Sequence, residues 1–230
     1  MTVTGVLFDL GGTIIRNQFS PPETFKKILE QKGIQVTEKE VQEALKKTEK
    51  DLADFLNDSG KIQSTDFYNL WDIQVLRFLG IESYTADLIS DINTRWSDVC
   101  GVDIFPDVIP AVESLRKRNI KSGIVSNAYE DEIEEIFERI NLPLSTFDCY
   151  VGVDTMGKRK PHPAIFLHAL DMLDVPVHQA LFIGDDLDKD YYGAEQAGIR
   201  SLLLVRDGNP PGNVRYILSL TSLEEFLSNK

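Results

Sequence analysis

The chain has 230 residues, of which 42% are hydrophobic and 27% are charged. That length can bury a complete hydrophobic core and carry a second small module, and the composition is too apolar for a disordered chain. The net charge of −13, from 37 acidic and 24 basic side chains, argues against a broad surface for nucleic acid or anionic membrane, so an anionic ligand needs a local positive site.

The two cysteines, Cys100 and Cys149, have no metal-ligand spacing, so we expect buried free thiols in a reducing compartment. No run of residues approaches the ~18 apolar residues that a membrane helix needs. The chain enters a strand-like segment almost at once, without a charged region followed by a long apolar stretch. We therefore expect a soluble, cytoplasmic protein, a monomer or homodimer, that binds neither nucleic acid nor membrane.

The first predicted strand lies within residues 3–10, where a short apolar run ends at Gly11 and Gly12. Further apolar runs of strand length occupy residues 122–125, 149–153, 180–183 and 201–205. Segments with helical spacing of apolar side chains lie between them, at residues 107–117, 133–140 and 165–173. Strands that alternate with helices predict an α/β fold with a doubly wound, Rossmann-like parallel sheet.

Residues 18–103 carry helical signals and no convincing strand. Two capping boxes open helices, Ser20 with Glu23 and Thr37 with Glu40, and two further helical faces lie in residues 67–78 and 85–99. We therefore predict a core domain of residues 1–17 and 104–230, with a four-helix domain of residues 18–103 inserted after the first strand. The insertion point lies at the carboxyl ends of the strands, where open α/β proteins bind ligands.

Candidate functional residues follow the predicted strands or lie close to them. They are Asp9, Ser126 with Asn127, Lys160, and Asp185 with Asp186, Asp188 and Asp190. Taken singly, each has an ordinary explanation: a turn cap for Asp9, a helix N-cap for Ser126 and a solvated side chain for Lys160. The acidic segment could likewise be the start of a helix. Because the carboxyl ends of parallel strands meet at one edge, the combination favours a shared site.

The residue types at that edge favour phosphoryl transfer with a magnesium ion. Several carboxylates repel one another unless a cation lies between them, and oxygen ligands without a cluster of His or Cys favour Mg²⁺ over zinc. A lysine neutralises a transferring phosphoryl group, and a serine hydroxyl with backbone N–H groups holds its oxygens. A carboxylate beside the metal can then attack, forming an aspartyl-phosphate that water hydrolyses.

The motifs resemble those of the haloacid dehalogenase (HAD) superfamily of phosphohydrolases over nearly the whole chain. Residues 8–13 (FDLGGT) resemble the first motif, 125–127 (VSN) the second, 160–163 (KPHP) the third and 184–190 (GDDLDKD) the fourth. The helical insertion is similar to the family's C1-type cap, which closes over the site and selects substrates. The resemblance therefore implies a C1-capped phosphatase-like protein that acts on a small phosphorylated metabolite.

The resemblance also implies a role for each matching position. Asp9 would be the nucleophile and a magnesium ligand, while Ser126 and Lys160 would be catalytic residues that contact the phosphoryl group. The phosphate-binding set would be Gly12, Ser126, Asn127 and Lys160. The metal would be held by Asp9, Asp185 and the backbone carbonyl of Gly11, with Thr13, Asp186 and Asp190 in support.

Gly11 departs from the family pattern. In most phosphatases of the family this position is a second aspartate, the general acid/base, which is typically worth 10²–10⁴-fold in rate. The proton for the leaving group could then come from elsewhere, as in the phosphonate-cleaving branch, or the leaving group could need little protonation, as in an acyl phosphate or sugar 1-phosphate. A weakly active or non-catalytic binding protein is a further alternative.

Two other classes of protein are compared with this pattern. A 2-haloacid dehalogenase has no need of the dense acidic segment from Asp185 to Asp190, so that segment favours a metal and phosphoryl transfer. A phospho-receiver domain places its paired acids first and its acceptor aspartate later, whereas here the single Asp9 comes first. The order of the acidic residues excludes the receiver.

Overall fold

The computed structural model describes residues 2–56, 61–82 and 85–227, so residues 57–60 and 83–84 of the predicted helical domain lie outside the described residues. The chain divides into two compact units. One, the sheet unit, comprises the residues up to Arg16 and those from Ile104 onwards, and the other, the helical unit, runs from Asn17 to Asp103. The first segment of the sheet unit thus ends at Arg16, one residue before the predicted end of residues 1–17.

The sheet unit is built on six strands in the order β5-β4-β1-β6-β7-β8. The strands are β1 (Gly5–Phe8), β4 (Lys121–Val125), β5 (Cys149–Val151), β6 (Ala180–Gly184), β7 (Arg200–Leu204) and β8 (Tyr216–Ile217). Every neighbouring pair is parallel. The predicted α/β fold with a parallel sheet is therefore confirmed, and the sequence analysis missed only the two-residue edge strand β8 among these six.

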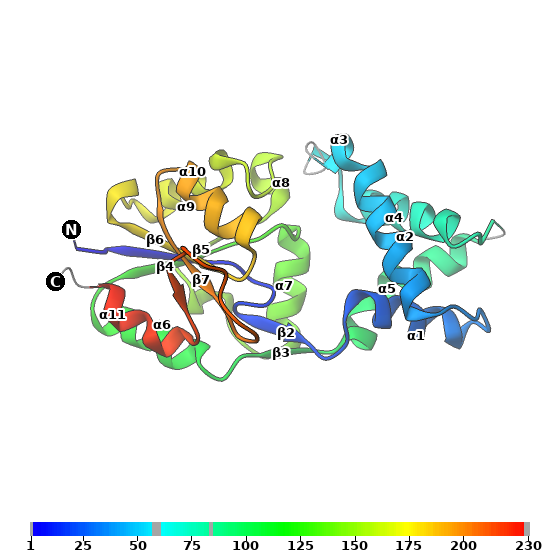
Figure 1. Cartoon of the computed structure of the whole chain (residues 1–230), viewed down its shortest axis with the longest axis horizontal. Helices are drawn as coiled ribbons and strands as arrows, with labels where there is room; N and C mark the ends of the chain where they lie inside the picture. The colour runs from blue at the N-terminus through cyan, green and yellow to red at the C-terminus, as the bar shows by residue number, and fades with distance from the viewer. Residues whose placement is uncertain (1, 57–60, 83–84, 228–230) are drawn as a thin grey trace. The chain divides into compact units, whose positions relative to one another are not determined.

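Helices cover both faces of this sheet (Figure 1). Helices α9 (Pro163–Leu173) and α10 (Gly193–Gln196) lie on one face, where Phe166 packs edge-on against Phe182 with ring centroids 4.9 Å apart. The other face carries α6 (Val108–Lys117) and α7 (Glu130–Arg139), and Phe137 there packs against Phe147, which in turn contacts Phe8. Alternate side chains of β1 thus enter two apolar layers, which fixes the strand in the middle of the unit.

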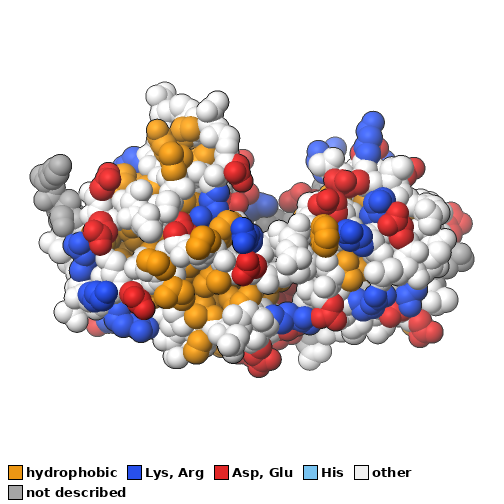
Figure 2. Space-filling view, turned by 90° about the horizontal axis from the view of Figure 1, so that it is seen from below, with side chains coloured by type: hydrophobic (Ala, Val, Ile, Leu, Met, Phe, Trp, Pro, Cys, Tyr) orange, Lys and Arg blue, Asp and Glu red, His pale blue; other side chains and the backbone are white. Residues whose placement is uncertain are grey.

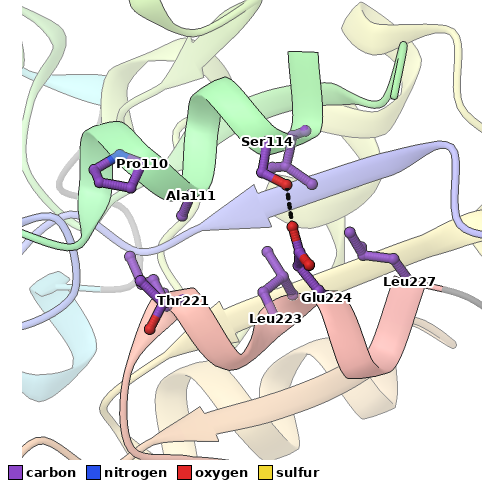
Figure 3. A pocket seen from close by; sticks show the side chains of 9 residues that line it. Pro110, Ala111, Ser114, Thr221, Leu223, Glu224 and Leu227 are labelled. Atoms are coloured by element: carbon purple, nitrogen blue, oxygen red, sulfur yellow. Dashed lines mark hydrogen bonds between the residues drawn. The ribbon is translucent and has the colours of Figure 1, made fainter. Parts of the chain in front are cut away.

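Shorter elements complete the sheet unit. They are α8 (Val153–Met156), α11 (Glu224–Leu227), the 3₁₀ turns η2 (Leu144–Thr146), η3 (Val177–Gln179) and η5 (Leu220–Leu223), and the π-helical turn η4 (Leu187–Tyr192). The C-terminal turn and helix lie beside α6, where a small cavity is lined by Pro110, Ala111 and Leu223 among others (Figure 3). Ser114 donates a 2.6 Å hydrogen bond to Glu224 across it.

The helical unit contains four longer helices and one short helix among its described residues. They are α1 (Pro21–Gln31), α2 (Glu38–Asp51), α3 (Ala53–Leu56), α4 (Ser64–Phe78) and α5 (Ala86–Cys100). Both capping boxes are formed, at Ser20 with Glu23 and at Thr37 with Glu40, so two N–H groups at each helix start are satisfied. The apolar faces of the longer helices pack into one core that includes Phe25, Ile28 and Leu76.

The prediction that residues 18–103 contain no strand is wrong at their C-terminal end. Residues Val102–Ile104 form strand β3, which pairs with β2 (Ile15–Asn17) in a separate two-stranded sheet. Each strand has three residues, too short for a period-2 pattern to appear in the sequence. The two segments form strands because the chain leaves the sheet unit through one and returns through the other, so their backbones pair.

The surface mixes charges of both signs. On the face seen in Figure 2, acidic and basic side chains are interspersed, and hydrophobic side chains gather over part of the sheet unit. Within the described ranges, no helix is both long and apolar enough to cross a bilayer.

The helical unit buries two polar groups without partners. Thr48 on α2 and Asp72 on α4 are 0% and 4% exposed, and Thr48 Oγ1 and Asp72 Oδ2 accept no hydrogen bond from any described residue. Burial raises the pKa of Asp72 well above its ordinary value of 3.8. Since the folded state binds this proton more tightly than the unfolded state, Asp72 lowers stability progressively as the pH rises above that ordinary value.

We expect Asp72→Asn to stabilise the helical unit by about 1–2 kcal/mol at pH 8 and by less at pH 5, because the stability that Asp72 costs grows as the pH rises above the ordinary pKa of an aspartate. Both tryptophans, Trp71 and Trp96, lie in this unit, so urea unfolding followed by tryptophan fluorescence reports on it alone. The control is Asp66→Asn, an exposed aspartate of the same helix. A gain in stability that is the same at both pH values would contradict the explanation that the cost comes from the buried charge of Asp72.

Candidate active site at the carboxyl edge of the sheet

Asp9 follows the central strand β1 and lies among the ends of its two neighbours. Phe8 is in register with Ile124 of β4 and Ile183 of β6, and the Asp9 N–H donates to the Ile183 carbonyl at 2.8 Å. The residue is only 7% exposed. This register places Ser126 and Asp185, which continue β4 and β6, at the same edge of the sheet.

Lys160 supplies the positive charge of this edge. Its side chain is 3% exposed, and its ammonium group donates a hydrogen bond to Asp9 Oδ1 and lies 2.7 Å from Asp190 Oδ1. Burial alone would lower the pKa of Lys160, but the carboxylates of Asp9 and Asp190 outweigh burial and raise it. Lys160 therefore keeps its charge at any physiological pH and joins residues that lie 151 positions apart.

Asn127 holds the backbone of Lys160. Its Oδ1 accepts from the Lys160 N–H at 2.7 Å, and its Nδ2 donates to the Lys160 carbonyl at 3.1 Å. The side chain was predicted to bind phosphate. In the structure both ends of its amide are occupied by the backbone N–H and C=O of a single residue, and Asn127 fixes the residue that carries the positive charge.

Asp190 and Asp186 differ sharply although both were predicted as supporting residues. Asp190 is 1% exposed, contacts Lys160, and accepts a 3.1 Å hydrogen bond from the Asp186 N–H. The carboxylate of Asp186 instead accepts from the N–H groups of Asp188 and Lys189, at 2.9 and 2.8 Å, and caps the turn η4. Asp190 thus belongs to the buried cluster, whereas Asp186 holds the turn that carries Asp190.

Three carboxylates converge closely enough to share a cation. One oxygen each of Asp9, Asp185 and Asp190 lies within 4.8 Å of the others. Burial raises the pKa of Asp9 to about 7, against the opposing effect of Lys160. The Asp185 residue is exposed, but partial desolvation of its carboxylate, with Asp190 adding to the rise, brings its pKa to about 6. A donor set of oxygens alone, with more negative charge than Lys160 neutralises, fits a magnesium ion.

The loop after Asp9 is held tightly against the fourth motif. Gly12 has φ of +77°, and a Cβ atom there would lie 2.2 Å from Asp185 Oδ2, so only glycine fits. The Gly12 N–H, predicted to bind phosphate, donates to the Ile15 carbonyl at 2.8 Å. Because a trans peptide holds its N–H and C=O in opposite directions, this bond turns the Gly11 carbonyl away from Ile15.

Gly11 itself is not required by the backbone. It is absent from the residues with positive φ, and a Cβ atom on it would meet no atom within 4 Å. Neither steric space nor dihedral strain therefore explains why this position lacks a side chain.

Ser126 and Thr13 provide two hydroxyl groups near this edge. The Ser126 N–H donates to the Val151 carbonyl at 3.0 Å, and its Oγ accepts from the Ala128 N–H at 3.1 Å, which leaves the hydroxyl proton free to donate. Thr13 is fully buried, and its Oγ1 has no hydrogen-bond partner among the described residues.

One residue of this edge escaped the sequence analysis. Arg206 follows β7 and donates hydrogen bonds to the carbonyls of Gly12 and Thr13, at 3.1 and 2.6 Å. A signal was present, since Arg206 stands just after the predicted strand at residues 201–205, the same kind of position that identified Asp9 and Asp185. Because Arg206 belongs to none of the four motifs, the sequence analysis did not single it out.

We expect Asn127→Leu, which is similar in size, to destabilise the protein by about 1–3 kcal/mol, because it leaves the N–H and C=O of Lys160 without partners. Urea unfolding followed by circular dichroism measures the change. Gln179→Leu is the control, since that amide oxygen accepts a single side-chain hydrogen bond, from Thr4 at 2.9 Å, away from the site. A loss of stability no larger than that of Gln179→Leu would show that the Asn127 amide does not hold the backbone of Lys160.

Comparison with known proteins gives full-length and partial relatives. A zebrafish (Danio rerio) "Haloacid dehalogenase-like hydrolase domain-containing protein 3" is 28% identical over 97% of this chain and 95% of its own length. A "Phosphoglycolate phosphatase" of Aquifex aeolicus is 33% identical over 43% of this chain and 46% of its own.

Two solved structures are similar to the chain over nearly its whole length. A "HAD phosphatase" from Thermococcus onnurineus is 26% identical, with a TM-score of 0.64 over 98% of both chains. A magnesium-bound "HAD-hydrolase" from Bacillus subtilis, 19% identical with a TM-score of 0.74 over 99% of both chains, shares the fold. Residues 6–204 match the family described as "Haloacid dehalogenase-like hydrolase", and the chain belongs to that family of hydrolases.

Proposed function

We propose that this phosphatase-like hydrolase depends on Mg²⁺ and cleaves a small phosphorylated metabolite through an aspartyl-phosphate on Asp9. The observation that carries the proposal is the arrangement of Asp9, which is buried, hydrogen-bonded through Oδ1 to Lys160, and within 4.8 Å of the carboxylates of Asp185 and Asp190. A purely structural strand-end aspartate does not need this surplus of negative charge around it.

In the proposed reaction these residues supply the nucleophile, the charge neutralisation and the metal ligands. Asp9 Oδ1 is held by Lys160, which leaves Oδ2 to attack the phosphorus atom. The bond from phosphorus to the leaving-group oxygen breaks as the new bond forms, and water then hydrolyses the aspartyl-phosphate to release phosphate and regenerate Asp9. The Lys160 ammonium and the hydroxyl proton of Ser126 offset the charge that develops on the phosphoryl oxygens. Asp9, Asp185 and the Gly11 carbonyl would hold the magnesium ion, which when bound supplies further charge neutralisation.

The class of substrate is inferred from the relatives and the charge. The names of two matched relatives are "Phosphoglycolate phosphatase" and "Glyceraldehyde 3-phosphate phosphatase", which supports a small phosphorylated metabolite. The net charge of −13 confines an anionic substrate to the lysine and metal at this edge. We further propose that the helical unit acts as a C1-type cap, and that the buried free thiols of Cys100 and Cys149 reflect a cytoplasmic location.

We expect Asp9→Asn to reduce hydrolysis of an activated aryl phosphate by at least about 10³-fold, because an amide oxygen is a poor nucleophile. Chelation of Mg²⁺ should stop the wild-type reaction. Phosphate release assays measure both, and Asp188→Asn, an exposed acid of the same segment, is the control that keeps activity. Metal-independent halide release from a 2-haloacid, with no turnover of any phosphate ester, would favour a dehalogenase and refute the proposal.

Gly11 predicts a dependence on the leaving group. Without an acid at this position, turnover should fall steeply as the leaving group becomes more basic, and Gly11→Asp should raise turnover of alkyl phosphates by about 10²-fold by supplying a proton. A Cβ atom on residue 11 would meet no atom within 4 Å, and the backbone there has no positive φ, so the substitution causes no strain at Cβ. Kinetics with a series of aryl and alkyl phosphates test this, with Gly12→Ala as the contrasting variant that should lose activity. Equal rates across the wild-type series would show that another group is the acid.

A further inference from the structure

Arg206, which follows β7, donates hydrogen bonds to the backbone of the first motif. Its Nε donates to the Gly12 carbonyl at 3.1 Å and its Nη2 to the Thr13 carbonyl at 2.6 Å. A guanidinium group presents its N–H groups in a rigid fork, so two carbonyls can be held at a fixed separation by one side chain. A lysine has a single ammonium group and cannot reproduce that geometry.

Asp107 and Phe105 keep the guanidinium in place. Asp107 accepts from Nη1 and Nη2 of Arg206, both at 3.1 Å, and it also accepts from the hydroxyl of Ser219 and the N–H of Leu220, both at 2.8 Å. The Phe105 ring lies below the guanidinium, 3.5 Å from Cζ to the ring centroid. The Arg206 side chain is 15% exposed and that of Asp107 12%, so solvent weakens this fork-to-fork pair little.

The carbonyls that Arg206 binds belong to a run of three constrained peptide units. The Gly11–Gly12 unit is fixed by the hydrogen bond from the Gly12 N–H to the Ile15 carbonyl. The Gly12–Thr13 unit is fixed by Arg206, which binds the Gly12 carbonyl. The Thr13–Ile14 unit is fixed at both ends, by Arg206 at the Thr13 carbonyl and by the 2.8 Å hydrogen bond from the Ile14 N–H to the Leu10 carbonyl. Rotation of any one unit would turn its neighbours, including the Gly11 carbonyl.

We infer that Arg206, locked by Asp107 and Phe105, is a positioning residue that sets the direction of the Gly11 carbonyl and keeps Gly12 against Asp185. Its hydrogen bonds go to the carbonyls of Gly12 and Thr13 and to Asp107, so it acts on the site through the backbone. The part of this inference that concerns magnesium rests on the proposed function, whereas the part that concerns the loop does not.

The alternative is that Arg206 merely ties segments of the fold together, as a surface ion pair does. Its contacts argue against this, because the carbonyls of Gly12 and Thr13 accept half of its hydrogen bonds while Asp107 is already satisfied by Ser219 and Leu220. A simple tie would not need a bond to each of two successive peptide units.

The test compares Arg206→Lys with Arg215→Lys in the full chain. Arg215 is the matched control, since it too binds a carboxylate, Glu195, and a backbone carbonyl, Ser201, but contacts no residue of the loop. We expect Arg206→Lys to weaken Mg²⁺ binding, measured by calorimetry, by about 10-fold or more, as substitutions behind metal ligands do. Amide hydrogen exchange of Gly12 and Ile14, measured by NMR, should become about 10-fold faster or more, while exchange in β6 stays as in the wild type.

The outcomes separate this inference from the proposed function. If the wild-type chain binds no Mg²⁺ and hydrolyses no phosphate, the proposed function fails, and the exchange rates of Gly12 and Ile14 alone decide the role of Arg206. Unchanged exchange in Arg206→Lys, or equal acceleration in Arg215→Lys, would overturn the inference. A uniform rise in exchange throughout the sheet would mean that Arg206 serves global stability, which also overturns it.

Discussion

The contact on which this molecule depends is that of the Lys160 ammonium with the carboxylates of Asp9 and Asp190. All three side chains are almost completely buried, and an uncompensated charge in such a place costs several kcal/mol. Other parts of the edge position the three side chains. The parallel register positions Asp9, and the amide of Asn127 holds the backbone of Lys160. The turn capped by Asp186 positions Asp190. Charge compensation within the fold is incomplete, since Asp185 adds a further carboxylate.

The surplus of negative charge explains how one cluster can hold the fold together and also bind a ligand. Burial pushes the pKa values of Asp9 and Asp185 upward, so the folded chain holds these groups at an electrostatic cost. Under the proposed function, a divalent cation would remove this cost and keep Asp9 ionised. Binding of the ion and activation of Asp9 as a nucleophile would then be one event, so Asp9 would become reactive only when the ion is bound.

The sequence predicted the fold and the edge where the polar residues gather, because apolar periodicity and the rule for parallel strand ends depend only on local patterns. It did not predict what Asn127, Asp186 and Arg206 bind. An amide or guanidinium group can serve a ligand or a nearby peptide equally well, and the choice follows from tertiary distances that no local pattern encodes. Strands β2, β3 and β8 were missed for a related reason: their pairing comes from neighbouring segments, and they are two or three residues long.

The close approach of Gly12 to Asp185 has a consequence for how the chain folds. These residues are separated by more than 170 positions, and contacts of such separation form only after the entropy of closing a long loop has been overcome. This edge of the sheet can therefore be complete only once β1 and β6 have come together. A nascent chain that comprises only the first motif and the helical unit has Asp9 but lacks Lys160, Asp185 and Asp190, so the cluster is complete only when the C-terminal third has been made.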